Sequence, residues 1–171
     1  MPTFERTSYR FDVLCDYGAF RDLQRHRLLT IEWQPLTARH GYEVPAEVEE
    51  AGAADDWKRV MDTCGQLHAE LRDELDIDAA QYAVPMAYKL RFVMQMNARE
   101  AMHLTELRYS PQGHPVYRRV AQEMHRLIDE EAGHHAIASA MRFVDRSGVD
   151  LERLEAERRA EAKRKAAGST G

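Results

Sequence analysis

The sequence predicts a helix-rich α/β (α+β) fold, in which a small sheet accompanies a helical bundle. Two stretches in which apolar and polar residues alternate, 8–17 and 86–96, predict strands. Apolar residues at helical spacing dominate most of the remaining chain. With 171 residues, of which 44% are hydrophobic, the chain can bury a core without disulfides or a structural metal.

The elements of the first third are predicted from hydrophobic periodicity and from residues that end strands and helices. In the strand 8–17, alternate residues share one apolar face: Tyr9, Phe11, Val13, Cys15 and Tyr17. Gly18 ends this strand, and a helix is predicted over 19–29 with the tripeptide Arg25-His26-Arg27 in its last turn. The stretch 30–45 is predicted to be irregular, and loops of that length inside compact domains are often functional.

The remaining elements are mostly helical. A short acidic helix is predicted at 46–51, and it is followed by a long helix that Asp55 or Asp56 can cap. Its apolar stripe consists of Trp57, Val60, Met61, Cys64, Leu67, Leu71 and Leu75. The strand 86–96 leads into a helix at 98–108, and a helix over 115–146 with a C-cap at Gly148 follows. A domain of residues 1–146 with a charged helix and frayed tail at 147–171 is therefore expected.

Composition excludes several classes of protein. The chain has 24 basic and 29 acidic residues, so a protein that binds nucleic acid through bulk positive charge is not expected. No apolar run approaches the roughly 20 residues of a membrane helix, and the first nine residues lack the apolar core of a signal peptide. The two cysteines, Cys15 and Cys64, lie on apolar faces, which indicates a reduced, cytoplasmic protein without a disulfide framework.

The tripeptide Arg25-His26-Arg27 is the first candidate site. Neighbouring helical residues diverge by about 100°, so three side chains converge on one ligand only where the helix ends and the backbone turns. Two guanidinium groups and an imidazole suit a pyrophosphate. The alternative is a basic helix end that complements the helix dipole.

The second candidate is the junction between the strand 86–96 and the following helix, where Asn97-Ala98-Arg99-Glu100 stands. A helix start offers free N–H groups and positive potential to an anion, and Arg108 stands about three turns further on. The alternative is structural, with Arg99 and Glu100 capping and solvating the first turn and Arg108 satisfying the last carbonyl groups.

A third pattern points to metal. Glu100 and His103, like Glu131 and His134, place a carboxylate and an imidazole one helical turn apart, as di-metal carboxylate bundles do. Such sites need a glutamate from two further helices, and two strands in so short a chain fit a four-helix bundle poorly. No metal is therefore assigned, and a helical di-metal protein is the third alternative.

Taken together, the first two motifs resemble the flavin-dependent thymidylate synthases, also called thymidylate synthase complementing proteins. That family carries Arg-His-Arg on a strand-helix-loop unit, then a Leu-Pro strand leading to Asn-x-Arg, then Leu-Arg and a histidine. In order, the corresponding residues of this chain are Arg25-His26-Arg27, Val84-Pro85, Asn97-Ala98-Arg99, Leu107-Arg108 and His114. The resemblance covers roughly residues 8–145 and implies the fold of that family.

The resemblance implies a cofactor, substrates and an assembly. FAD would contact Arg25, His26, Arg27, Asn97 and Arg99, with His103 where the family usually has asparagine. Arg25 and Arg108 would bind the nucleotide substrate, and Arg108 would be the catalytic arginine that favours the ionised pyrimidine ring. The implied reaction converts dUMP to dTMP with methylenetetrahydrofolate and NADPH, in a homotetramer with FAD bound between subunits.

The sequence also departs from the family pattern. After Arg-His-Arg the family continues with Ser, Asn, Glu, Ser and Arg, whereas this chain has Thr30, Glu32, Trp33, Pro35 and Thr37. A family glutamine ahead of the motif is Asp22, and an arginine before the Leu-Pro is Gln81. Each lost arginine removes charge-assisted bonds to phosphate worth about 1.5–3 kcal/mol. Methylation of dUMP is therefore in question, while part of the flavin site remains.

The missing residues leave a second interpretation open. The chain would then be a non-catalytic module that keeps the fold and assembles with a complete partner domain. The upstream His-Ser and Glu-His segments of the family are not found, so the chain is either a shortened homologue or half of a duplicated enzyme. Trp33 could stack on an aromatic ring, although ordinary packing is the simpler role.

Overall fold

The computed structural model describes residues 3–108 and 113–142. The chain divides into two compact units: Met1–Tyr9 with Met96–Gly171, here unit 1, and Arg10–Gln95, here unit 2. The expected tail at 147–171 and the expected C-cap at Gly148 lie outside the described residues. No helix in the described part of the chain has the length and apolar character required to cross a membrane.

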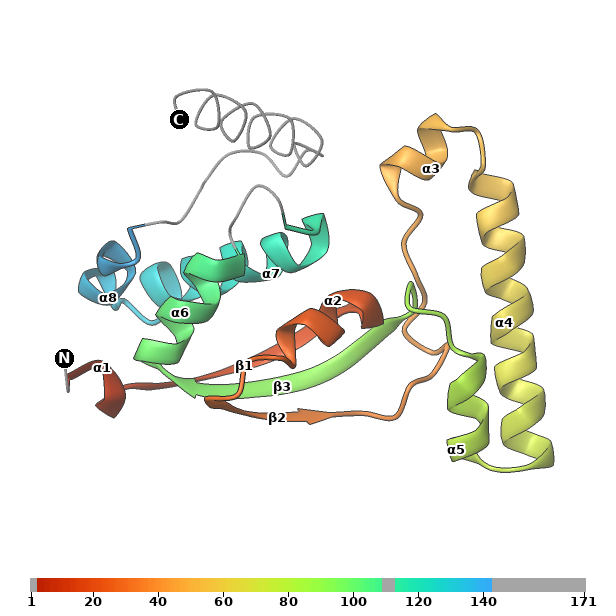
Figure 1. Ribbon diagram of the computed structural model, residues 1–171, viewed down its shortest axis with the longest axis horizontal. Coiled ribbons are helices and arrows are strands. Elements are labelled where there is room, and N and C mark those ends of the chain that lie inside the picture. Colours follow the sequence, from red (N-terminus) through yellow and green to blue (C-terminus); the bar gives the residue numbers. More distant parts are fainter. Residues whose placement is uncertain (1–2, 109–112, 143–171) are drawn as a thin grey trace, which may run out of the picture. The chain divides into compact units, whose positions relative to one another are not determined.

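The sheet has three antiparallel strands, with the central strand contributed by the second apolar-polar repeat. β1 (Ser8–Asp16) and β2 (Leu29–Trp33) flank β3 (Lys89–Asn97), as Figure 1 shows. Every second residue of β1 and of β3 is buried, which confirms the two predicted strands and the face each one buries. Most of the sheet belongs to unit 2, and the chain passes into unit 1 at residues 9 and 96.

The prediction for residues 19–45 is wrong in two places. The helix α2 is Tyr17–Leu23, shorter than 19–29, and the Asp16 side chain caps it by accepting a hydrogen bond from the Ala19 N–H at 2.7 Å. The chain then turns, and Leu29–Trp33 pairs as β2 at the start of the predicted irregular stretch. A five-residue strand that buries little gives only a weak alternating signal.

Besides α2, the helices of unit 2 follow β2 along the chain. They are α3 (Ala46–Glu50), α4 (Ala54–Glu74), α5 (Ile77–Ala80) and the 3₁₀ turn η1 (Gln81–Ala83). α5 lies alongside the end of α4 (Figure 1). The predicted stripe of α4 is only partly a core face: Met61 packs with Val84 and Tyr88, whereas Val60, Leu67 and Leu75 are exposed.

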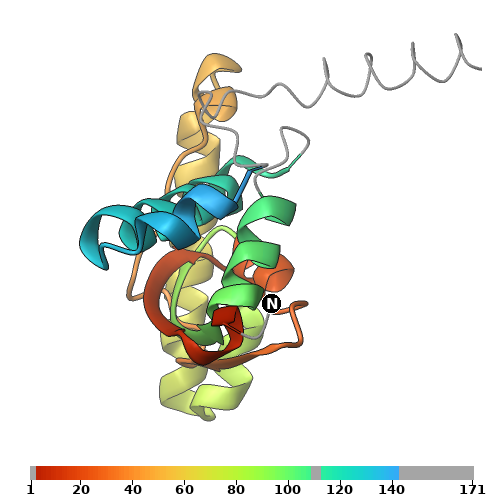
Figure 2. The ribbon, with the colours of Figure 1, turned by 90° about the vertical axis from the view of Figure 1, so that its left-hand side faces the viewer.

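Apart from the strand residues 8–9 and 96–97, the regular structure of the described part of unit 1 is helical. It contains α1 (Thr3–Arg6), α6 (Ala98–Arg108), α7 (Pro115–Arg126), the π-helical turn η2 (Leu127–Glu131) and α8 (His135–Ala140). Figure 2 shows α6, α7 and α8 grouped together, and α6 and α7 are in contact. The predicted continuous helix 115–146 is wrong, because the helical path is interrupted at Gly133, whose φ of 66° is left-handed.

Candidate functional site

The cationic tripeptide lies in the turn between α2 and β2, not in the last helical turn. The His26 N–H donates to the Leu23 carbonyl at 3.2 Å, and the His26 side chain is buried. Arg25 and Arg27 on either side are exposed, and Arg25 forms an ion pair with Asp22 at 3.4 Å. The structure thus turns one ring inward and leaves two guanidinium groups in solvent.

Apolar packing beneath α2 positions this turn. Phe20 and Leu23 are almost completely buried, and the Phe20 ring meets Phe92 of β3 edge-on with centroids 4.8 Å apart. Trp33 of β2 lies 5.6 Å from the Phe20 ring centroid and is 56% exposed. Trp33 therefore packs as expected on one side and still offers an aromatic surface to solvent on the other.

The second motif begins α6 in unit 1. The Asn97 side chain accepts a hydrogen bond from the Glu100 N–H at 2.9 Å, and the Ala98 N–H donates to the Thr7 carbonyl at 2.9 Å. Asn97 is therefore an N-cap, whereas the structural alternative for this helix start had assigned the first turn to Arg99 and Glu100. Its amide group retains two N–H donors for a ligand.

The other predicted residues of α6 have mixed environments. Arg99 is exposed and forms an ion pair with Glu5 of α1 at 2.8 Å, and His103 is exposed. The Arg108 guanidinium lies over the Tyr117 ring, 5.2 Å from its centroid, a cation–π contact. His114, the last residue of the motif series, caps α7 by accepting a hydrogen bond from the Val116 N–H at 3.3 Å.

The predicted site residues consequently divide between the two units. Arg25, His26 and Arg27 belong to unit 2, and the predicted residues of α6 belong to unit 1. Each group is rich in N–H donors, and each includes an exposed arginine with a neighbouring carboxylate. Both groups suit anionic oxygen ligands such as phosphate.

The metal alternative is not supported. Glu100 is buried at the start of α6, whereas Glu131 is exposed at the end of η2. His134 Nδ1 is hydrogen-bonded to the Tyr9 hydroxyl at 2.8 Å, and burial raises the pKa of Tyr9. No three histidine, cysteine or carboxylate residues among those described gather where they could hold a metal ion.

Two departures from the family pattern have structural roles here. The Gln81 side-chain oxygen accepts a hydrogen bond from the Leu36 N–H at 3.0 Å, and the Thr37 hydroxyl accepts one from the Arg39 N–H at 3.3 Å. Both contacts hold the loop that follows β2. Cys15 is buried as predicted, and burial raises the pKa of its thiol to about 12, so this sulfur is inert at neutral pH.

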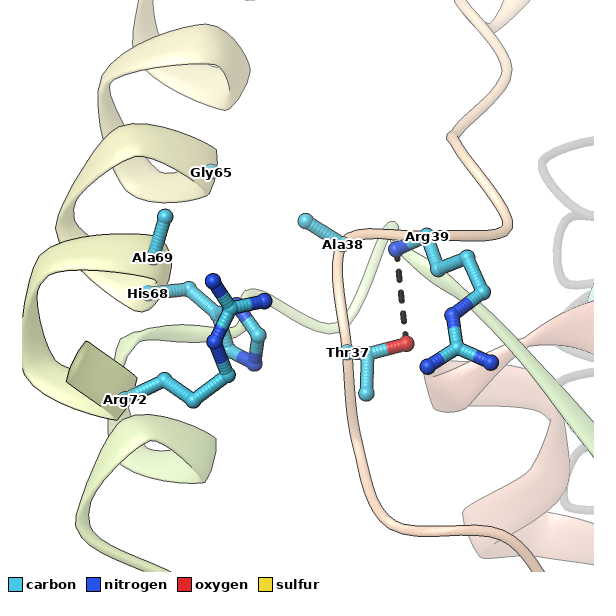
Figure 3. A pocket seen from close by; sticks show the side chains of 7 residues that line it. All are labelled: Thr37, Ala38, Arg39, Gly65, His68, Ala69 and Arg72. Carbon is cyan, nitrogen blue, oxygen red and sulfur yellow. Dashed lines mark hydrogen bonds between the residues drawn. The ribbon is translucent and has the colours of Figure 1, made fainter. Parts of the chain in front are cut away.

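Sequence analysis did not identify a pocket between this loop and α4 (Figure 3). The pocket has a volume of about 310 Å³ and is lined by Thr37, Ala38, Arg39, Gly65, His68, Ala69 and Arg72. His68 was the available signal, because it interrupts the apolar stripe of α4 one turn after Cys64 and one turn before Arg72. A basic pair at that spacing on a helix faces the same side.

Comparison with known proteins identifies relatives over most of the chain. The family described as thymidylate synthase complementing protein matches residues 1–134. A UPF0159 protein of Chlamydia muridarum is 39% identical over 158 residues, and one of Chlamydia pneumoniae is 39% identical over 157 residues. A UPF0159 protein of Thermoplasma acidophilum is 37% identical over 161 residues.

Coverage differs between this chain and those relatives. The alignments span 92% of this chain for both Chlamydia proteins and 94% for the Thermoplasma protein. They span only 29% of each Chlamydia protein and 32% of the Thermoplasma protein, so the chain covers less than a third of their length. Because the family match extends over most of its residues, the chain belongs to the thymidylate synthase complementing protein family.

Proposed function

We propose that this chain is a flavin-dependent thymidylate synthase-like protein that binds FAD through Arg25, His26, Arg27, Asn97, Arg99 and His103. The family is flavin-dependent and serves dTMP biosynthesis, which supports the cofactor and the general activity. The single observation that carries the proposal is the family match over residues 1–134, which includes both cationic motifs.

The side chains in these motifs fit the chemistry of FAD. The cofactor carries a pyrophosphate, and guanidinium groups bind its oxygens through paired N–H donors. Arg27 is exposed and makes no ion pair with any residue that the structure describes, so its guanidinium is available to phosphate. Arg99 stands in the first turn of α6, where the helix dipole also favours negative charge.

The same proposal assigns substrates to Arg25 and Arg108. The family is associated with nucleotide and folate substrates, which supports dUMP, methylenetetrahydrofolate and NADPH as reactants. Reduced flavin supplies the redox chemistry of dUMP methylation when the cofactor is bound. Arg108, packed on Tyr117, would stabilise negative charge on the pyrimidine ring, because a fixed guanidinium needs no reorganisation as charge develops.

A second candidate is a non-catalytic module that associates with a homologous domain. Thr37 and Gln81 stand where the family has phosphate-binding arginines, and Gln81 is engaged in holding the loop backbone. The relatives are also more than three times as long as the segment they share with this chain. In this proposal the fold is kept for assembly, and a homologous partner supplies the missing cationic residues.

The test of FAD binding compares single variants by fluorescence titration. Arg27→Ala should weaken FAD binding about tenfold or more, because one charge-assisted contact to phosphate is lost. Arg59→Ala is the matched control, since Arg59 is an exposed arginine of α4 that pairs with Asp56 and is assigned no role in the site. Equal FAD affinities in both variants would contradict the assignment.

Co-expression with a complete homologue separates the two candidates. If the chain is the flavoenzyme, it takes up FAD alone and forms dTMP when supplied with dUMP, methylenetetrahydrofolate and NADPH. If the chain is the module, it stays colourless alone and acquires flavin only in the complex.

A further inference from the structure

A second concave surface of unit 2 lies outside the residues proposed to bind FAD and nucleotide. This groove has a volume of about 520 Å³, and its walls come from Val48 of α3, the first half of α4 and residues 85–87. Apart from Asp56, the described residues that line it are apolar. Binding sites of about 300–1,000 Å³ with mostly apolar walls are typical of proteins, so the groove is large enough to hold apolar groups of a ligand.

The groove exposes large apolar side chains from two separate segments. Val60 of α4 is 55% exposed, and Met86, which follows Pro85, is 56% exposed. Single apolar side chains on a surface need no explanation, but these two line the same groove. An apolar patch bordered by polar residues is typical of a surface that binds another molecule.

Hydrogen bonds hold the walls of the groove in place. The Ala53 N–H donates to the Val48 carbonyl at 3.0 Å, which joins α3 to the start of α4. The Gly18 N–H donates to the Met86 carbonyl at 2.9 Å, which fixes the backbone of another wall. Since these bonds form within the chain itself, a partner that enters the groove orders little additional backbone.

Two methionines give the groove an adaptable surface. Met61 is only 3% exposed, and Met86 is more than half exposed. Both side chains line the groove. Methionine is unbranched and polarizable, so it adjusts to apolar side chains of different shapes. Methionine-lined grooves that accept the apolar face of an amphipathic helix are a recurring mode of peptide recognition.

The rim of the groove is acidic. Residues 46–56 include α3 and the start of α4, which lie side by side in Figure 1. This segment has no basic residue and five acidic ones: Glu47, Glu49, Glu50, Asp55 and Asp56. All five are exposed, and of these only Asp56 has an ion pair within the described part of the chain, with Arg59. The negative potential of this rim favours a cationic partner.

We propose that this groove binds a basic amphipathic helix of a protein partner. Apolar side chains at helical spacing would pack against Val60 and Met86, and lysine or arginine side chains beside them would face the carboxylates of residues 46–56. The same carboxylates disfavour an acidic helix, which gives the groove its specificity. Because no residue of the groove is assigned to FAD or nucleotide, helix binding and FAD binding can succeed or fail separately.

Methyl nuclear magnetic resonance of the full chain, labelled isotopically at its methionine methyl groups, tests this proposal. The probe is a synthetic peptide of leucine and lysine in which leucine recurs at helical spacing. The Met86 signal, assigned through its loss in Met86→Leu, should shift saturably with this peptide, and binding should weaken as salt rises. Peptides with the same composition in scrambled order, or with glutamate in place of lysine, should leave the signal unchanged.

Either of two results would overturn the proposal. In the first, the Met86 signal does not respond to the leucine–lysine peptide. In the second, it responds equally to the scrambled peptide or to the peptide that carries glutamate, so that neither the apolar face nor the positive charge matters.

Two lysine variants of α4 locate the binding site in the same titration. Val60→Lys should weaken peptide binding about tenfold or more, because an apolar contact is lost and a like charge is added. Leu67→Lys is the matched control, since Leu67 is 45% exposed on the same helix and does not line the groove. It should bind the peptide as the wild type does, and equal weakening in both variants would place the peptide elsewhere.

A second pair of variants tests the acidic rim. Glu49→Lys should weaken peptide binding by about threefold or more, because it replaces attraction with repulsion at the groove. Glu70→Lys makes the same change of charge on an exposed part of α4 away from residues 46–56, and it should have little effect. Identical affinities in these two variants would contradict a role for the rim.

Discussion

The turn after α2 and the start of α6 both present arginine to solvent, but different forces hold them. The turn stands on buried side chains, because Phe20 and Leu23 anchor α2 against the sheet. The start of α6 is held by backbone hydrogen bonds to Asn97 and Thr7. The position of the candidate ligand-binding residues in the turn therefore depends on core packing. The position of those at the start of α6 depends on a helix cap.

This difference separates changes in stability from changes in binding. A substitution beneath the turn should alter both, because the backbone of residues 24–28 follows the position of α2. A substitution of an exposed arginine should alter binding alone, since its ion pair in solvent adds little stability.

Leu23→Ala should have the largest effect. Leu23 is fully buried, so its truncation leaves a cavity and lowers the free energy of unfolding by about 2–5 kcal/mol. Urea unfolding measures this change, and flavin uptake should fall with it. Leu28→Ala is the control, because Leu28 is 72% exposed and should change stability by less than about 0.5 kcal/mol. Equal stability of the two variants would show that packing does not hold the turn.

Asn97→Ala should have an intermediate effect on the other segment. Loss of the cap on the Glu100 N–H lowers the free energy of unfolding by about 1 kcal/mol. Asn97→Asp keeps a side-chain acceptor and should remain close to the wild type in the same urea titration. If Asn97→Asp is as unstable as Asn97→Ala, capping is not the role of Asn97.

Glu5→Gln should change binding more than stability. The Glu5–Arg99 ion pair is exposed, so its removal alters unfolding by about 1 kcal/mol at most. The freed Arg99 should raise FAD affinity by roughly up to fivefold, the equivalent of that pair energy. Fluorescence titration of FAD measures the change, and an affinity that falls would mean that Glu5 assists binding rather than competes with it.

The smallest expected effect concerns the ion pair between Asp12 of β1 and Arg91 of β3. The hydrogen bonds from Arg91, at 2.9 and 2.5 Å, lower the pKa of the Asp12 carboxyl. A lowered pKa in the folded state contributes stability above the unfolded pKa, and this contribution is lost as pH falls through the folded value. Arg91→Ala should return the Asp12 pKa toward its usual value in a carbon-detected pH titration, and an unchanged midpoint would argue against the pairing.

Strong local patterns predicted the elements that carry the site. β1 and β3 alternate over nine residues each, and α6 begins directly after β3, where the strand-to-helix junction was predicted. β2 was missed because its pairing with β3 is a long-range contact that five residues hardly signal. The break at Gly133 was missed because apolar residues keep helical spacing on both sides of it.

The candidate site was only partly predictable for a similar reason. The order of the motifs identified the cationic residues in the sequence. Which carboxylates pair with them is decided only when the chain folds. Glu5 is 94 residues from Arg99 in sequence, and no local pattern connects the two. His68 interrupts an apolar helical stripe, and only the loop folded opposite it shows that this residue lines a pocket.

The most direct test of the central claim is the visible absorption spectrum of the purified chain after incubation with FAD and gel filtration. We expect a retained yellow band that NADPH bleaches, and a band diminished in Arg27→Ala but not in Arg59→Ala. A colourless wild-type chain that gains no flavin even beside a complete homologue would contradict it.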